Sequence, residues 1–143
     1  MTLVFMGGTC NNSKWRNNLI KYSDSKNYNI DWFNPVVDDW APDMIQKEYE
    51  IKKKADFQIY VITPKMTGIF SIAEVVDASN KIPHKTIFYV LEKDNDKEFE
   101  EFQKKSLREV ENVVKMNGSY IATSLENIAD YINVKSQINK YLP

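Results

Sequence analysis

Residues 56–80 read DFQIYVITPKMTGIFSIAEVVDASN, and this stretch decides the fold because it holds a buried strand, a turn and the start of a helix. The apolar, β-rich run at residues 57–62 is typical of a central parallel strand that is covered on both faces. Pro64 and Gly68 mark the turn after the strand, and residues 69–79 have helical composition. One carboxylate, Glu74, lies early in that helix and just past the carboxyl end of the strand, where open α/β sheets bind their ligands.

Two interpretations of Glu74 are open at this point. A carboxylate at the ligand-binding edge of a sheet is a candidate nucleophile or general base. In the alternative, Glu74 faces solvent or stabilises the helix N-terminus, where negative charge is favourable.

The rest of the chain repeats the alternation of strand and helix. Strands are predicted at residues 2–6, 28–33, 56–62, 86–91 and 120–122, and helices at 14–22, 42–54, 69–80, 99–117 and from 124 onward. This alternation favours a single α/β domain over residues 1–143 with a parallel sheet. Five strands in this length suit a flavodoxin-like (Rossmann-like) three-layer sandwich with strand order 2-1-3-4-5.

Three local features complete this prediction. Ser13 is expected to be the N-cap of the first helix. The basic run at residues 52–54 is expected to be a solvated face at a helix C-terminus, where cations are favourable. Residues 92–96 are expected to form a charged loop.

Composition excludes several classes of function. The net charge of -1 gives no electrostatic footprint for a nucleic-acid polymer or an anionic membrane surface. The one cysteine, Cys10, cannot form an internal disulfide, and the first residues are too short and uncharged for a signal peptide, so a cytoplasmic location is expected. The one histidine, His84, nearly excludes His-rich metal sites and Ser-His-Asp chemistry.

The predicted strand order brings three segments to one crevice at its switch point. They are Gly7–Thr9, the loop 34–40 and the segment 66–74 that leads to Glu74. The two glycines either form a notch of free backbone N–H groups or only let the chain turn. The full dinucleotide or P-loop pattern is absent. The pair Asp38-Asp39 beside Trp40 either binds and stacks on a base or is a solvated loop.

Three stretches in this order carry a resemblance to a known family. They are FMGGTCNNSKWR at residues 5–16, DWFNPVVDDW at 31–40 and the stretch DFQIYVITPKMTGIFSIAEVVDAS at 56–79. Together they resemble the nucleoside 2-deoxyribosyltransferase-like family, which includes base-exchanging transferases and deoxynucleoside-monophosphate N-hydrolases. The segment GIFSIAE at residues 68–74 looks like the turn-to-helix segment that carries the family nucleophile.

The resemblance implies a role for each candidate residue. Glu74 maps onto the nucleophile and Glu48 onto an acid near the substrate, with no metal or organic cofactor. The implied substrate-binding residues are Gly8, Thr9, Cys10, Asn34, Asp38, Asp39, Trp40, Met66, Thr67 and Ser71. The chain departs from the family pattern at Phe5, where many members have a tyrosine that holds the nucleophile.

The implied reaction transfers the sugar of a (deoxy)nucleoside to another base through a covalent glycosyl-glutamate. The leaving base needs a proton, for which Asp38, Asp39 and Glu48 are the candidates. The alternatives are a (deoxy)nucleotide N-hydrolase that uses water, a non-catalytic nucleotide-binding module and a structural protein. Apolar residues on the helices 42–54 and 69–80 further predict a homo-oligomer, with a dimer as the minimum unit.

Overall fold

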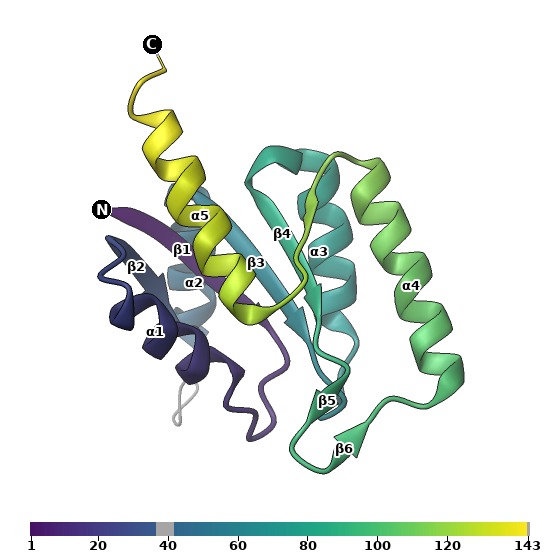
Figure 1. Cartoon of the computed structure of the whole chain (residues 1–143). Coiled ribbons are helices and arrows are strands. Elements are labelled where there is room, and N and C mark those ends of the chain that lie inside the picture. The colour runs from purple at the N-terminus through teal and green to yellow at the C-terminus, as the bar shows by residue number, and fades with distance from the viewer. Residues whose placement is uncertain (37–41, 143) are drawn as a thin grey trace.

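A computed structural model describes residues 1–36 and 42–142 and shows a parallel sheet sandwiched between helices (Figure 1). The sheet has five strands in the order β2-β1-β3-β4-β7. Its strands are β1 (Thr2–Gly8), β2 (Ile30–Phe33), β3 (Phe57–Ile62), β4 (Thr86–Val90) and β7 (Tyr120–Ile121). This is the predicted order of a flavodoxin-like sandwich, so the prediction of the fold class is confirmed.

Helices cover both faces of the sheet. They are α1 (Trp15–Ser25), α2 (Pro42–Lys54), α3 (Phe70–Lys81), α4 (Glu101–Met116) and α5 (Leu125–Asn139), with a short 3-10 turn η1 at Pro83–Lys85. α1 and α5 lie over one face, and α2, α3 and α4 pack on the other (Figure 1). Two separate cores result, one on each side of the sheet.

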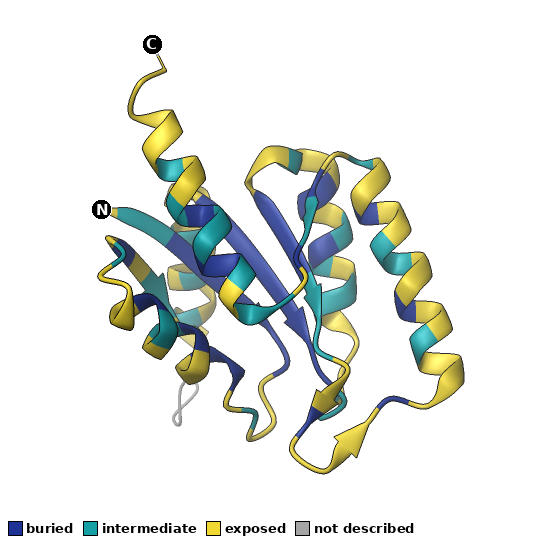
Figure 2. Ribbon diagram, in the orientation of Figure 1, coloured by how far each residue is buried: buried dark blue, intermediate teal, exposed yellow. Residues whose placement is uncertain are grey.

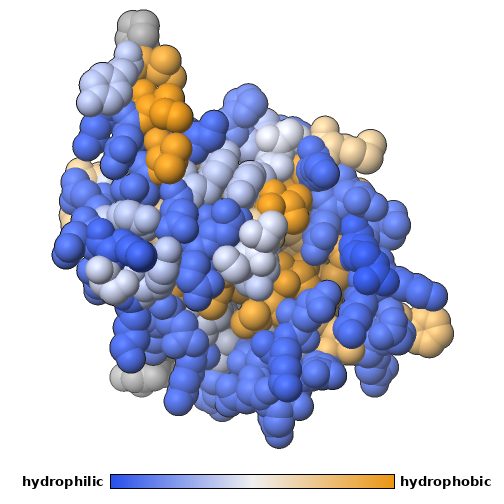
Figure 3. Space-filling model, in the orientation of Figure 1, coloured by the Kyte–Doolittle hydropathy of each residue, from blue (hydrophilic) through white to orange (hydrophobic). Residues whose placement is uncertain are grey.

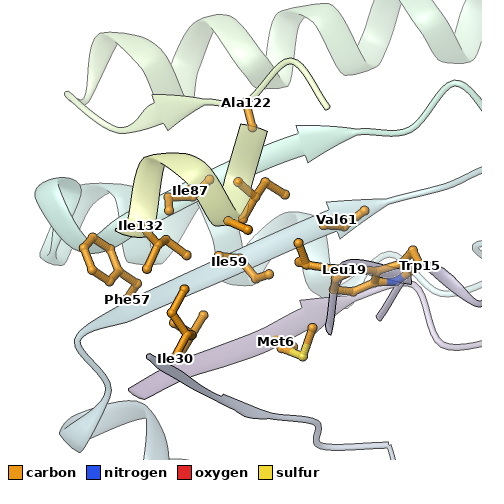
Figure 4. Packing of buried hydrophobic residues seen from close by; sticks show 13 residues of the cluster. Met6, Trp15, Leu19, Ile30, Phe57, Ile59, Val61, Ile87, Ala122 and Ile132 are labelled. Carbon is orange, nitrogen blue, oxygen red and sulfur yellow. The ribbon is translucent and has the colours of Figure 1, made fainter. Parts of the chain in front are cut away.

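The centre of the sheet is the most buried part of the molecule, and the outer sides of the helices are exposed (Figure 2). Every residue of β3 is buried, as expected for a strand covered on both faces. On the α1–α5 face, Trp15, Leu19 and Ile132 pack against Ile59 and its neighbours in the sheet (Figure 4). Burial of each such side chain contributes roughly 1.5–3 kcal/mol to folding.

The first helix starts differently from the prediction. Lys14 is the N-cap of α1 and its side chain makes no capping hydrogen bond. The Ser13 hydroxyl donates a hydrogen bond of 2.6 Å to Asp94 and accepts a long one, 3.4 Å, from the N–H of Trp15, so Ser13 lies one residue before the N-cap position, which was predicted for it. By contrast, Ser124 caps α5 at the predicted start of the last helix, since its side chain accepts a hydrogen bond from the Asn127 backbone N–H at 2.9 Å.

The predicted charged loop after β4 contains a two-stranded antiparallel hairpin. Its strands are β5 (Lys93–Asp94) and β6 (Lys97–Glu98), which pair Lys93 with Glu98 and Asp94 with Lys97. Asn95 adopts a left-handed conformation with φ of 58° and makes the turn, as asparagine commonly does. The hairpin places Asp94 beside the carboxyl ends of β1 and β3.

The last helix ties the C-terminal half of the chain to its beginning. The Thr2 hydroxyl donates to the Ser136 hydroxyl at 2.9 Å. Tyr22 and Tyr28 both donate to one oxygen of Asp130, at 2.9 and 2.7 Å, and this contact raises the pKa of Tyr28 to about 12. Beyond these contacts the end of α5 projects from the body, with apolar atoms gathered along it (Figure 3).

Among the described helices, none is long and apolar enough to cross a membrane.

Candidate functional site

A groove of about 930 Å³ lies between α2 and α3, a volume in the range of small-molecule sites. Glu48 and Lys52 line it from α2, and Phe70, Glu74 and Asp77 line it from α3. Gln58 and Tyr60 of β3 form part of its floor. The structure therefore brings the two carboxylates predicted as catalytic, Glu48 and Glu74, into one groove.

Glu74 is held by a lysine from the opposite wall. The Lys52 Nζ donates a hydrogen bond to Oε2 of Glu74, and the two side chains are only 20% and 16% exposed. The same ammonium lies 4.9 Å from the centre of the Phe5 ring. Lys52 is thus part of the site, and the prediction that residues 52–54 form a solvated face holds only for Lys53 and Lys54.

Glu48 has different surroundings from Glu74. It lies one helical turn before Lys52 on α2 and is half-buried. Burial raises the pKa of Glu48, and the negative charge of Glu74 raises it further, while the positive charge of Lys52 lowers it. Glu48 therefore has a higher pKa than an exposed glutamate and lies in the same groove as a carboxylate that is paired with an ammonium.

The floor of the groove is polar and well ordered by hydrogen bonds. The Tyr60 hydroxyl donates to Oε1 of Gln58 at 2.7 Å, and Nε2 of Gln58 donates to the Lys52 carbonyl at 3.3 Å. Burial, followed by the charge of Glu74, raises the pKa of Tyr60, so its phenol stays neutral. Sequence reasoning missed Lys52, Gln58 and Tyr60, because nothing in the local pattern shows that these side chains meet.

A second, smaller pocket of about 150 Å³ lies at the carboxyl edge of the sheet. Its walls include most of the predicted substrate-binding residues: Gly8, Thr9, Cys10, Met66, Thr67 and Ser71. Phe70 lines both hollows and is 72% exposed. The single crevice predicted from the strand order is therefore two hollows in this structure, which have Phe70 in common.

Four predicted residues lie elsewhere. Asn34 is exposed, and its side-chain oxygen accepts a hydrogen bond from the Val36 N–H at 2.9 Å. It does not line either hollow as the described residues define them. Asp38, Asp39 and Trp40 fall outside the described residues.

The glycine segment at the end of β1 serves close packing of the backbone. Gly8 has φ of +119°, and a Cβ there would overlap the backbone of Val61. The Thr9 N–H donates to the Val61 carbonyl at 2.9 Å. These two contacts use the space and the N–H group that a bound phosphate would need at Gly8 and Thr9.

Arg16 holds the glycine segment in place through hydrogen bonds from the protein interior. Its guanidinium is 4% exposed and donates to the carbonyls of Met6, Gly8 and Thr9, with distances of 2.8–3.3 Å. Desolvation by burial lowers the pKa of Arg16, and the carbonyl contacts compensate for the lost hydration. Arg16 therefore supports the loop from inside instead of facing a ligand.

Asp94 joins three segments at this edge of the sheet. It is buried and accepts hydrogen bonds from the hydroxyls of Ser13 at 2.6 Å and Thr63 at 2.7 Å. The Lys65 Nζ lies 3.9 Å from its other oxygen. Asp94 thus fixes the loop after β1 and the turn after β3 to the hairpin.

Within the described part of the chain, no three His, Cys, Asp or Glu side chains are grouped so that they could hold a metal ion.

Comparison with known proteins agrees with this arrangement. A family model described as nucleoside 2-deoxyribosyltransferase like matches residues 1–94, which run from β1 through the groove to Asp94. No curated protein and no solved structure matches the chain significantly. The matched residues make up more than half of the chain and include Glu48 and Glu74 of the groove. The chain belongs to the nucleoside 2-deoxyribosyltransferase-like family.

Proposed function

We propose that the protein is a glycosyl-transfer enzyme that cleaves the N-glycosidic bond of a (deoxy)nucleoside, with Glu74 as the nucleophile. The observation that carries this proposal is the half-buried carboxylate of Glu74, paired with the Lys52 ammonium in a groove large enough for a nucleoside. An ionised carboxylate that is held in place in a partly desolvated site has the properties that a nucleophile needs.

The reaction consists of two displacements at the anomeric carbon. In the first, an oxygen of Glu74 forms a bond to C1′ while the bond from C1′ to the base nitrogen breaks, and the electron pair goes to the base. In the second, the nitrogen of a new base attacks C1′, gives its proton to the group that protonated the leaving base, and releases the Glu74 carboxylate. Both steps pass through oxocarbenium-like states, as in retaining glycoside hydrolysis.

Glu48 is the favoured proton donor to the leaving base. Sequence reasoning left Asp38, Asp39 and Glu48 as equal candidates for this role. The raised pKa of Glu48, caused first by burial and then by the charge of Glu74, supports Glu48 because a general acid must hold its proton.

The smaller pocket and the segment after β2 provide the remaining substrate contacts in this proposal. The sugar lies against Gly8, Thr9, Cys10 and Asn34, and Asp38, Asp39 and Trp40 bind the base. Met66, Thr67 and Ser71 complete the wall of the smaller pocket next to Phe70.

A nucleoside fits the site better than a nucleotide that places its 5′-phosphate on the glycine segment. Arg16 is the arginine closest in sequence to that segment, and backbone carbonyls already occupy its guanidinium. The Thr9 N–H is likewise used by Val61.

Hydrolysis, with water as the second nucleophile, is the second candidate function. The observation that favours it is the exposure of the groove rim, where Phe70 is 72% and Tyr49 56% exposed. Water can reach an open rim unless another molecule covers it. We propose that a second copy of the chain provides this cover and thereby favours base transfer.

The deciding experiment follows base release by chromatography. The protein is incubated with a deoxynucleoside, with and without a second free base, and in parallel with the deoxynucleoside monophosphate. Base exchange only in the presence of the second base supports the transferase, and release without it supports the hydrolase. Binding of the nucleoside without any release in wild-type protein would identify a non-catalytic binding module.

The variant Glu74→Ala tests the nucleophile in the same assay. We expect turnover to fall below detection while nucleoside binding and the far-UV circular dichroism spectrum stay as in the wild type, because Glu74 lines the groove and belongs to neither core. Glu50→Ala is the matched control, since Glu50 is exposed on α2 and does not line the groove. Undiminished base release in Glu74→Ala would contradict the assignment.

A further inference from the structure

Lys52 differs from the lysines that follow it. Its side chain is 20% exposed, whereas Lys53 and Lys54 are exposed residues. Its ammonium donates a hydrogen bond to Glu74 and lies over the face of the Phe5 ring. A lysine that loses hydration in this way needs contacts with negative charge or aromatic faces in return, and Lys52 has both.

A second carboxylate lies within reach of the same ammonium. Glu48 precedes Lys52 by four residues on α2, a spacing that places the two side chains next to each other on one helix face. Glu48 and Glu74 therefore flank Lys52 from two helices. The pKa of Glu48 responds to both neighbours, since Lys52 lowers it and Glu74 raises it.

We propose that Lys52 is a positioning residue that changes partners during the reaction: its ammonium holds Glu74 for attack and then binds Glu48. This inference rests on the proposed function, in which Glu74 attacks C1′ and Glu48 protonates the base. In this inference, the Lys52 ammonium pairs with whichever of the two carboxyls is ionised, so the net charge of the three groups stays constant.

The balance of charge among Glu74, Lys52 and Glu48 supports this change of partner by Lys52. In the proposed function Glu48 holds its proton before attack, so the charges of ionised Glu74, the Lys52 ammonium and neutral Glu48 cancel. Attack converts Glu74 into a neutral glycosyl ester, and the C1′–nitrogen electron pair leaves with the base. Glu48 gives its proton to that base and becomes a carboxylate, so the ammonium again has one negative partner. Loss of the Glu74 charge also removes one of the causes that raise the pKa of Glu48, which makes the proton easier to give up.

Lysine suits this task because its ammonium is a compact charge on a flexible stem with three rotatable donors. The Phe5 ring gives the ammonium a further contact that does not depend on which carboxylate is ionised. Arginine has a planar, wider head group, so it can keep the charge but not the same positions.

The first test compares Lys52→Met with Lys54→Met in the base-release assay. Both variants lose one positive charge from the end of α2, but Lys54 is exposed and does not line the groove. We expect Lys52→Met to lower kcat about 100-fold, with KM changed less than about threefold, because the lost donor acts on the reacting carboxylate. Lys54→Met should retain the wild-type kcat. A Lys52→Met variant that turns over at the wild-type rate overturns the inference.

The second test separates positioning from a purely structural role. Lys52→Ala leaves a space beside Glu74 that a small primary amine can enter. Added methylamine should restore part of the lost kcat in a saturable manner, and Lys52→Arg should fall between Lys52→Ala and the wild type. A loss that neither methylamine nor arginine repairs, together with a lowered Tm, identifies Lys52 as structural and overturns the inference.

The third test needs no turnover and so separates failure of the inference from failure of the proposed function. The pKa of the Glu48 carboxyl is measured by ¹³C NMR in the wild type, Lys52→Met and Glu74→Gln. Removal of Lys52 should raise this pKa and removal of the Glu74 charge should lower it, because these two charges shift it, while Lys53, Asp77 and Lys81, which also line the groove, stay unchanged in both variants. If the wild-type protein turns over no nucleoside, the proposed function fails. The titration then tests by itself whether Lys52 and Glu48 are linked. An unchanged pKa in Lys52→Met overturns the link between Lys52 and Glu48.

Discussion

Glu48 and Glu74 carry the same chemical group, but the groove gives the two carboxyls different tasks. Glu74 faces an ammonium that compensates its negative charge. Glu48 loses hydration and meets the charge of Glu74, and both effects raise its pKa. A pair of carboxyls with opposed environments is the usual arrangement for a nucleophile and a proton donor in glycosyl transfer.

At the residue scale, Glu48→Gln tests the proton donor through the pH dependence of the rate. The raised pKa lets Glu48 stay protonated to a higher pH than an exposed glutamate, and the wild-type rate should fall as the pH rises through that pKa. Glu48→Gln should be slow at all pH values and should lack this alkaline fall. By linkage, ionised Glu48 costs stability above the pH at which the unfolded chain titrates, so Glu48→Gln should become more stable than the wild type there.

Profiles of kcat/KM against pH for the two proteins provide the measurement, with urea unfolding at two pH values for stability. If both profiles have the same alkaline limb, another acid or a water molecule protonates the base.

Gly8 provides a second prediction at this scale, because Gly68 offers a matched control. A Cβ at Gly8 would overlap the Val61 backbone and would sit at a φ of +119°. We expect Gly8→Ala to lose on the order of 3 kcal/mol of unfolding free energy through this overlap and the backbone strain. Gly68 has open space around its Cβ position, so Gly68→Ala should unfold at nearly the wild-type urea concentration. Equal midpoints for the two variants would show that β1 and β3 can move apart.

At the element scale, three loops depend on one carboxylate. Asp94 comes from the β5–β6 hairpin, Ser13 from the loop after β1 and Thr63 from the end of β3. The smaller pocket is built from the same two loops, since Thr9, Cys10, Met66 and Thr67 line it. The hairpin therefore controls the shape of a pocket that it does not itself line.

Removal of this carboxylate should loosen both loops together. We expect Asp94→Ala to cost about 3 kcal/mol, because two hydrogen bonds to a charged, buried acceptor are lost. Asp96→Ala is the control, since Asp96 is exposed in the turn of the same hairpin. Hydrogen exchange should show faster amide exchange at residues 9–13 and 63–67 in Asp94→Ala only. Faster exchange confined to the hairpin would contradict the proposed coupling.

The main elements were predictable from the sequence because their signals are local. The apolar run at Phe57–Ile62 and the Pro-initiated helix at Pro42–Lys54 have the predicted positions, and the alternation of elements gives the strand order. The β5–β6 hairpin was not predicted, because its two-residue strands are charged and have no apolar alternation. Asn95 next to Asp96 was the one turn signal that could have revealed it.

The candidate site was predictable only in part, because contacts between side chains of different elements leave no local signal in the sequence. Glu74 stands out because it follows a buried strand, and Glu48 was suggested by the family resemblance. Lys52 belongs to a run of three lysines at a helix end, so the sequence offers no reason to separate it from Lys53 and Lys54. Only the packing of α2 beside α3 brings its ammonium to Glu74.

At the scale of the whole molecule, the apolar side chains around the groove predict self-association. Of the residues expected to form an interface, Ile45, Ile69 and Phe70 are exposed, whereas Val75 is buried in the core. We expect a homodimer by light scattering at micromolar concentration, because exposed apolar clusters commonly mark interfaces.

Ile69→Glu should convert this dimer to a monomer, since Ile69 is 77% exposed and does not line the groove. Met116→Glu is the control, because Met116 is 85% exposed on α4 and does not line the groove. A wild-type protein that has a monomer mass and full transferase activity would rule out both the interface and its role in excluding water.

The last helix, α5, covers a sheet whose strands come mostly from the residues that match the family. The match ends at residue 94, yet Ile128 and Ile132 of α5 are fully buried against the sheet opposite the groove. Without α5, the face of the sheet that includes Ile59 and Val61 would lose much of its cover, and Asp130 would no longer anchor Tyr22 and Tyr28. We therefore expect that the matched segment is not an autonomous folding unit, and that its part of the sheet becomes stable only after the last helix has been synthesised and docked.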